Sequence, residues 1–90
     1  MTTLERVATI RNKRGLHARA AAKLAQVAGA YTADVTVSRG GQSVSGTSIM
    51  GLMMLAASPG TEIGLAASGK DAAAALDAIC ELIDAKFEED

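Results

Sequence analysis

Hydrophobic residues change their spacing several times along this 90-residue chain, and the order of the changes limits the folds that it can adopt. They alternate with polar residues over 34–38 and 63–67, which is the period of a strand with one buried face. They recur every three or four residues over 17–29 and again over about 70–87, which is the period of an amphipathic helix. The chain therefore combines strands with helices that must cover them.

Further elements complete this pattern. Residues 4–10 have the mixed β-branched and polar composition of a first strand, and residues 39–42 contain two glycines that favour a hairpin turn. A strand around Val44 and a short helix through Leu55 should follow the hairpin. The resulting order, β-α-β-β-α-β-α, predicts a single α+β domain over residues 1–90. We expect an open-faced β-sandwich, in which three helices cover one face of a four-stranded antiparallel sheet and the other face is solvated.

The composition excludes several classes of function. A net charge of −1 and only two aromatic residues argue against a nucleic-acid binder, which needs a basic surface and stacking platforms. One cysteine and one histidine are too few for a disulfide framework or a Cys/His zinc site, and we expect neither a metal nor a cofactor. The apolar runs are too short to span a membrane, and the N-terminal segment lacks the apolar core of a signal peptide. We therefore expect a cytoplasmic protein, and we expect it to be a monomer.

The charges are distributed unevenly along the chain. Residues 1–30 contain six basic residues and one acidic residue, a net charge of +5, whereas residues 61–90 contain two basic and eight acidic residues, a net charge of −6. One interpretation is two ordinary solvated surfaces. The other is a basic patch around the first loop and helix that meets an anion or an acidic partner.

His17 stands at the predicted beginning of the first helix and is the only histidine. A helix N-terminus exposes N–H groups without intrahelical partners and carries a partial positive charge, so it favours an anion. The backbone N–H groups of Ala18 and Arg19 and the guanidinium of Arg19 could donate to one such anion. A neutral imidazole in this position suits a phosphorylated histidine, and the alternative is a histidine that only packs or faces solvent.

The segment from Asn12 to Ala21, NKRGLHARAA, resembles the active-site segment of the HPr family, the phosphocarriers of the bacterial phosphoenolpyruvate-dependent phosphotransferase system. The resemblance extends over nearly the whole chain. It implies that His17 accepts a phosphoryl group from enzyme I, usually on Nδ1, and passes it to an enzyme IIA, while Arg19 helps to hold the phosphate. Such a protein is a stoichiometric carrier and not an enzyme. Ala20 replaces the proline that is usual in the family, so we expect a more flexible helix start with the chemistry intact.

Residues 46–54 also resemble the HPr family, in which the serine matching Ser48 is presented by some members to an HPr kinase/phosphorylase. The resemblance implies regulatory phosphorylation at Ser48 that weakens binding to enzyme I. From the residues alone, Thr47 or Ser48 can serve as the N-cap of the short helix. A helix this short cannot bury all of its large apolar residues, so we predict an adaptable partner-docking patch. The predicted partner-binding residues are Lys23, Ile49, Met50 and Met53.

Three other functions are alternatives to a phosphocarrier for sugar uptake. Residues 48–60 and the acidic end, 87–90, also resemble the nitrogen-related branch of the family, NPr, whose members serve a regulatory phosphorelay. A coregulator that binds its partner through residues 48–54, with no phosphorylated histidine, is a second alternative. A hydrolase that uses His17 and a serine is disfavoured, because the sequence shows no residue placed to orient the histidine and no nucleophile elbow.

The last predicted helix contributes no chemistry of its own. Cys80 follows Ile79 and is expected to be a small packing residue. The acidic residues of this helix are expected to form its solvated face: Asp71, Asp77, Glu81 and Asp84.

Overall fold

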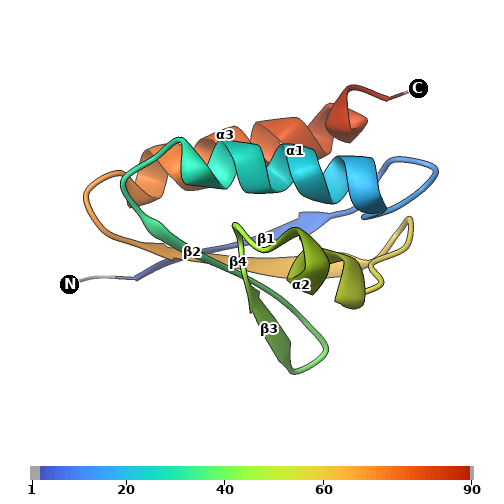
Figure 1. Ribbon diagram of the computed structural model, residues 1–90, viewed down its shortest axis with the longest axis horizontal. Coiled ribbons are helices and arrows are strands. Elements are labelled where there is room, and N and C mark those ends of the chain that lie inside the picture. The colour runs from blue at the N-terminus through green and yellow to red at the C-terminus, as the bar shows by residue number, and fades with distance from the viewer. Residues whose placement is uncertain (1–2, 90) are drawn as a thin grey trace.

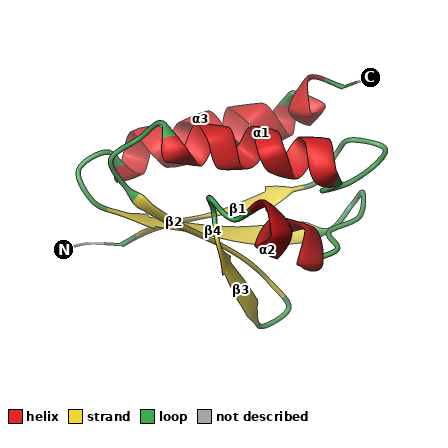
Figure 2. Cartoon of the chain, in the orientation of Figure 1, coloured by secondary structure: helices red, strands yellow, loops and turns green. Residues whose placement is uncertain are grey.

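The computed structural model describes residues 3–89. Its elements are β1 (Leu4–Thr9), α1 (Ala18–Gly29), β2 (Asp34–Arg39), β3 (Gln42–Ser45), α2 (Ile49–Met54), β4 (Glu62–Ser68), α3 (Ala72–Asp84) and the turn η1 (Lys86–Glu88). The strands form one antiparallel sheet in the order β1-β4-β2-β3. Figures 1 and 2 show α1 and α3 lying side by side over one face of this sheet, and α2 contacts α1. The predicted α+β open-faced sandwich is confirmed.

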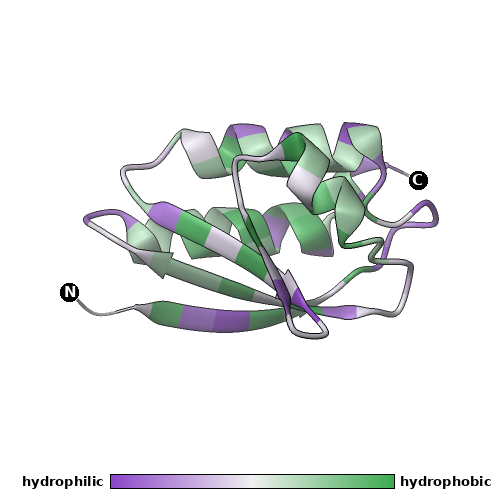
Figure 3. Cartoon of the chain, turned by 60° about the horizontal axis from the view of Figure 1, so that its bottom comes forward, coloured by the Kyte–Doolittle hydropathy of each residue, from purple (hydrophilic) through white to green (hydrophobic). Residues whose placement is uncertain are grey.

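The alternation of residues along the strands assigns the two faces of the sheet. Val37 pairs with Leu65, which pairs in turn with Arg6, so these three positions share the face toward the helices. Val37 and Leu65 are buried there, and Figure 3 shows the alternation of hydropathy along β2. Val7 lies on the opposite face and is 70% exposed, which agrees with the predicted solvated face.

The core lies between the sheet and the helices. Alanines such as Ala20, Ala21 and Ala75 have no exposed surface, and their small side chains let the helices approach one another and the sheet closely. Larger side chains from all three helices fill the remaining space. The fully buried ones are Leu24 in α1, Leu52 in α2, and Leu76, Ile79 and Ile83 in α3.

The last helix ends at Asp84, earlier than the predicted end near residue 87. Lys86, Phe87 and Glu88 instead adopt left-handed backbone conformations, with φ of 57°, 55° and 62°. Each such conformation costs roughly 1–2 kcal/mol for a residue other than glycine, and full burial of a phenylalanine side chain contributes roughly 1.5–3 kcal/mol in the opposite direction. Phe87 has no exposed surface, so its burial in the core offsets part of the cost of the turn.

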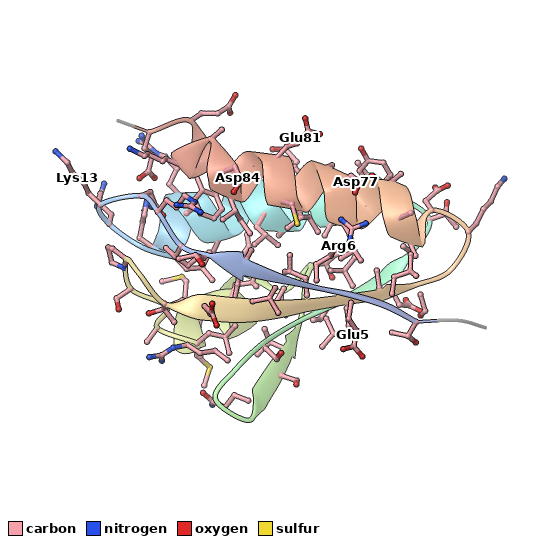
Figure 4. All side chains as sticks on the ribbon, turned by 180° about the vertical axis from the view of Figure 1, so that it is seen from behind. Glu5, Arg6, Lys13, Asp77, Glu81 and Asp84 are labelled. Carbon is pink, nitrogen blue, oxygen red and sulfur yellow. The ribbon has the colours of Figure 1, made fainter. Side chains whose placement is uncertain are left out.

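Two acids on the predicted solvated face of α3 form ion pairs with β1 and the loop that follows it. Asp77 Oδ1 accepts a hydrogen bond from Arg6 Nη1 at 2.8 Å, and Asp84 Oδ1 lies 3.8 Å from Arg11 Nε. Figure 4 shows Arg6 directed toward Asp77, and Glu5 directed away from the helices. All four paired side chains are more than 40% exposed, so water screens both pairs and they contribute little to stability.

Candidate functional site

The loop between β1 and α1 is fixed by a close backbone contact with the segment that precedes β4. Gly15 adopts a φ of +66°, and a Cβ atom built there would lie 2.5 Å from the carbonyl oxygen of Ala57. The N–H of Leu16 donates to the same oxygen at 2.9 Å, and the Leu16 side chain is buried. Glycine suits both the backbone angle and the space, and these contacts position the next residue, His17.

His17 is the N-cap residue of α1, but its side chain makes no capping hydrogen bond. Its carbonyl oxygen accepts the first intrahelical bond, from the N–H of Ala21 at 2.8 Å. The N–H groups of Ala18, Arg19 and Ala20 precede this bond and therefore lack intrahelical acceptors. The beginning of α1 thus keeps unpaired donors next to the imidazole, which suits an anion.

The imidazole of His17 contacts a carboxylate from the far end of the chain. Its Nε2 is paired with Glu89 Oε2, and the two side chains are only 15% and 16% exposed. The amide of Asn12 donates from Nδ2 to Glu89 Oε1 at 3.0 Å and to the carbonyl oxygen of Gly15 at 2.7 Å. The Asn12 hydrogen bond, aided by the hydrogen bond and charge of His17, lowers the pKa of Glu89. Glu89 is therefore an ionised carboxylate at neutral pH.

An open cleft beside the imidazole contains most of the basic patch predicted from the charge distribution. It is lined by Lys13, Arg14, Arg19, Lys23, Glu88 and Glu89. Lys23 Nζ donates to the carbonyl oxygen of Phe87 at 2.7 Å and lies 3.8 Å from Glu88 Oε1. Within residues 3–89, the other three cations form no ion pair. The acidic end of the chain therefore folds back onto the basic patch and leaves part of its charge available.

The second predicted site begins at Ser48, which is the N-cap of α2. Its Oγ accepts a hydrogen bond from the N–H of Gly51 at 3.0 Å, so Ser48 and not Thr47 caps the helix. α2 buries Leu52 and leaves its other large apolar side chains exposed, as predicted. The exposed fractions are 43% for Ile49, 71% for Met50, 41% for Met53 and 68% for Met54.

Sequence reasoning missed Asn12 and Glu89. The expectation that no residue orients His17 is wrong, because Glu89 contacts its Nε2 and Asn12 holds Glu89. Asn12 belongs to a polar loop, yet it has no exposed surface. The opposite net charges of residues 1–30 and 61–90 were the available signal, but they do not say which acid meets which base. Within the described chain no serine hydrogen-bonds His17, so the contact with Glu89 does not restore the hydrolase interpretation.

The described part of the chain shows neither a metal site nor a membrane-spanning helix nor a reactive cysteine. Residues 3–89 contain no cluster of three or more potential metal ligands, and none of their helices is long and apolar enough to cross a membrane. Cys80 packs partly against the core, as predicted, and burial raises the pKa of its thiol. A raised pKa disfavours the thiolate, so Cys80 is a poor nucleophile and His17 is the better candidate.

A family model described as the PTS HPr component phosphorylation site matches residues 4–85. The chain belongs to the HPr family of phosphocarrier proteins. The match spans His17, Arg19 and Ser48, and it ends before the acidic tail that carries Glu89. Membership in the HPr family supports a phosphocarrier role in the phosphotransferase system, which is the general part of the expectation from the sequence.

Both branches of the HPr family occur among the similar proteins. Phosphocarrier protein NPr of Shewanella violacea is 54% identical over 89 residues, which cover 99% of this chain and 98% of the relative. Phosphocarrier protein HPr of Cupriavidus necator is 50% identical over 86 residues, which cover 96% of this chain and 97% of the relative. These identities establish the family without deciding the branch.

Solved HPr structures share the fold. The crystal structure of HPr-C-His from Thermoanaerobacter tengcongensis matches with a TM-score of 0.92 and 39% identity, and it covers 97% of this chain and 98% of the other. A second structure from that organism, described as an HPr dimer, matches with a TM-score of 0.77 and 41% identity over 89% and 92% of the two chains. The sheet and helices of this chain are therefore arranged as in known HPr proteins.

Proposed function

We propose that this protein is a stoichiometric phosphocarrier, in which His17 accepts a phosphoryl group from phospho-enzyme I and passes it to an enzyme IIA of the phosphotransferase system. The observation that carries this proposal is the position of His17, whose side chain stands at the beginning of α1 without capping it. The imidazole supplies the nucleophile, and the helix N-terminus and Arg19 supply positive charge, so the transfer needs no metal or cofactor. The protein acts in the cytoplasm as a monomer.

The transfer begins with attack of an imidazole lone pair on phosphorus. The HPr family favours Nδ1 for this attack, and Nε2 of His17 is already in contact with Glu89. The phosphoryl oxygens would accept hydrogen bonds from the N–H groups of Ala18 and Arg19 and from the Arg19 guanidinium. A charge held at a helix N-terminus gains about 0.3–1 kcal/mol per contact. Contacts of this size adjust the transfer equilibrium without trapping a phosphate that the carrier must pass on.

Enzyme I and enzyme IIA dock in turn on the surface formed by α2 and the beginning of α1. Ile49, Met50 and Met53 are exposed there, and flexible apolar side chains can adapt to more than one partner. Arg19 adds positive charge next to this surface. Lys23 is also proposed as a partner-binding residue, although its ammonium group already donates to the carbonyl oxygen of Phe87.

Ser48 is the proposed site of regulatory phosphorylation by an HPr kinase/phosphorylase. A phosphate there adds about −1.5 to −2 charges within the docking surface. Its oxygens can accept the Gly51 N–H in place of Oγ, so α2 should stay folded while binding to enzyme I weakens. The absence of any mass increase on Ser48 when the kinase and ATP are supplied would remove the regulatory part of the proposal.

Incubation with phosphoenolpyruvate and enzyme I tests the central proposal. The wild-type protein should gain one phosphoryl group that is labile in acid and stable in alkali, and Arg19→Ala should gain it more slowly with an intact fold. The absence of an adduct on the wild-type protein would contradict the carrier function. Unfolding of Arg19→Ala would assign Arg19 a structural role instead.

The nitrogen-related branch is the second candidate, and the 54% identity to NPr of Shewanella violacea favours it. Transfer from the phosphorylated protein to a sugar-type or to a nitrogen-type enzyme IIA distinguishes the two branches. A coregulator that acts through residues 48–54 alone would bind its partner equally well after His17→Ala. Light scattering tests the monomer, since one related HPr structure is described as a dimer.

A further inference from the structure

We propose that Glu89 is a positioning residue for His17: its carboxylate accepts the Nε2–H of the imidazole, leaves Nδ1 as the nucleophile and balances the charge of the phosphorylated ring. This role rests on the proposed function, because it concerns the same histidine. It lies outside the family match, which ends at residue 85.

The contact between ring and carboxylate fixes the position of the ring proton. An ionised carboxylate accepts hydrogen bonds and donates none, so Nε2 must carry the proton that faces Glu89 Oε2. In a neutral imidazole the free lone pair is then on Nδ1. No group of residues 3–89 hydrogen-bonds Nδ1, and it is not among their buried unpartnered atoms. This nitrogen therefore stays open to a phosphoryl donor.

Asn12 holds the carboxylate in place. Both partners of its Nδ2, Glu89 Oε1 and the carbonyl oxygen of Gly15, are acceptors, so their chemistry fixes which end of the amide faces them. This orientation leaves Asn12 Oδ1 buried without a hydrogen-bond partner, which is unfavourable. The two Nδ2 hydrogen bonds must offset that cost, and one of them exists only because Glu89 is present.

The chain that leads to Glu89 is anchored as well. Phe87 is buried in the core, within a left-handed turn that residues other than glycine seldom form. Lys23 of α1 donates to the carbonyl oxygen of Phe87 at 2.7 Å. The tail is thus held by the core, by α1 and by the hydrogen bonds of Glu89, whereas a frayed terminus has no such contacts. The position of Glu89 is therefore built into the fold.

Attack by Nδ1 creates a charge that Glu89 can balance. The Nδ1–P bond forms while the bond from phosphorus to the donor atom of phospho-enzyme I breaks, and that electron pair leaves with the donor. The proton stays on Nε2, so the phosphorylated ring is positively charged, and its Nε2–H forms a charge-assisted hydrogen bond with Glu89. Transfer to an enzyme IIA returns the electron pair of the Nδ1–P bond to Nδ1, and the ring proton does not move in either step.

Substitutions at two adjacent acids test this role. Each variant is compared with the wild-type protein in its phosphorylation rate with enzyme I and phosphoenolpyruvate. The ¹⁵N shifts of the His17 ring are measured in alkaline solution, at a pH above which the ring signals no longer change. Glu89→Gln presents an amide that can donate to Nε2, so the ring proton should move toward Nδ1. The phosphorylation rate of Glu89→Gln should fall about tenfold. A tenfold change corresponds to the low end of the free energy of a hydrogen bond to a charged group.

Two further variants serve as controls. Glu89→Asp keeps the charge on a shorter side chain and should recover part of the rate. Glu88→Gln removes one negative charge from the same cleft without a hydrogen bond to the ring, so the ring proton should stay on Nε2, and any change in its rate measures the effect of net charge alone. The dispersion of the amide signals in the same spectra shows whether each variant is folded.

An unchanged phosphorylation rate in folded Glu89→Gln would overturn the proposal. A faster rate would overturn it too, because the carboxylate would then compete with phosphate for the cationic cleft. The ring-proton measurement needs no phosphorylation, and a proton that stays on Nε2 in Glu89→Gln would contradict the positioning role. If the wild-type protein is not phosphorylated, the proposed function fails, and the ¹⁵N shifts still decide whether Glu89 positions the ring.

Discussion

The two helices at the candidate site begin in opposite ways. At α2, a helix of six residues, Ser48 Oγ accepts the N–H of Gly51. At α1, a helix of twelve residues, the side chain of His17 makes no capping bond. A capping side chain contributes about 1 kcal/mol, and an uncapped N-terminus forgoes this and keeps its donors for a ligand. The N-cap side chain of α2 therefore stabilises its helix, whereas the N-cap side chain of α1 does not, which is compatible with the chemical role proposed for His17.

His17→Ala should give the largest effect and should separate chemistry from stability. We expect complete loss of phosphorylation by enzyme I, measured by intact-protein mass spectrometry. The free energy of unfolding in urea should fall by only about 1.5 kcal/mol, the low end for a hydrogen bond to a charged group, because the ring caps nothing and loses only its contact with Glu89. A loss of stability as large as that of a core substitution would show that the ring is mainly structural.

Gly15→Ala tests whether the loop before α1 positions His17. The new Cβ would lie 2.5 Å from the carbonyl oxygen of Ala57, at a φ of +66°. We expect a loss of about 3 kcal/mol in the free energy of unfolding, from strain and displacement together. The phosphorylation rate should fall as well, because Leu16 and His17 must shift.

Gly40→Ala is the matched control for this prediction. Gly40 also has a positive φ, of 55°, but a Cβ atom there would meet nothing within 4 Å. The expected loss is therefore only about 1 kcal/mol, with no change in phosphorylation. Equal losses in the two variants would mean that backbone conformation, and not the contact with Ala57, determines the need for Gly15.

The sequence predicts α1 and the place of His17 at its beginning well, but it predicts poorly the end of α3 and the residues that contact His17. The periods of 2 and 3.6 residues locate the strands and helices, and they place His17 at a helix start because these patterns reflect one-sided burial. The end of α3 is different. Phe87 continues the spacing of Ile79 and Ile83, so periodicity alone cannot distinguish a continued helix from a left-handed turn that buries the same ring.

The partners of the charged residues are also beyond the sequence. Asn12 and Glu89 lie 77 residues apart, and their contact depends on the path of the chain after α3. The same holds for Arg6 and Asp77, which are 71 residues apart. The opposite net charges of residues 1–30 and 61–90 predict that the two segments attract one another. They do not identify which acid pairs with which base, because that depends on where the packed core places each side chain.

Ser48→Ala tests how much the N-cap stabilises α2. Loss of the hydrogen bond from Gly51 should lower the free energy of unfolding by about 1 kcal/mol, measured in urea. Phosphorylation of His17 should continue, because Ser48 takes no part in it. Thr47→Ala, next to the cap, should cost less than Ser48→Ala, since within residues 3–89 the Thr47 hydroxyl hydrogen-bonds only to exposed Ser45 and not to the backbone of α2. A larger loss of unfolding free energy for Thr47→Ala than for Ser48→Ala would show that Thr47, and not Ser48, caps the helix.

The smallest expected effect is a pH dependence that belongs to α1 and not to α2. The hydrogen bond from Asn12, aided by His17, lowers the pKa of Glu89 below its usual 4.5, so the folded protein favours the ionised carboxylate more than the unfolded chain does. The resulting stabilisation is complete above the unfolded pKa and is lost as the pH falls through the lower folded pKa. The difference in free energy of unfolding between wild type and Glu89→Gln should therefore shrink as the pH falls from about 5.5 to 3. The difference between wild type and Ser48→Ala should stay constant over the same range, because that cap contains no titratable group. A constant difference for Glu89→Gln would show that the folded protein does not favour the ionised carboxylate.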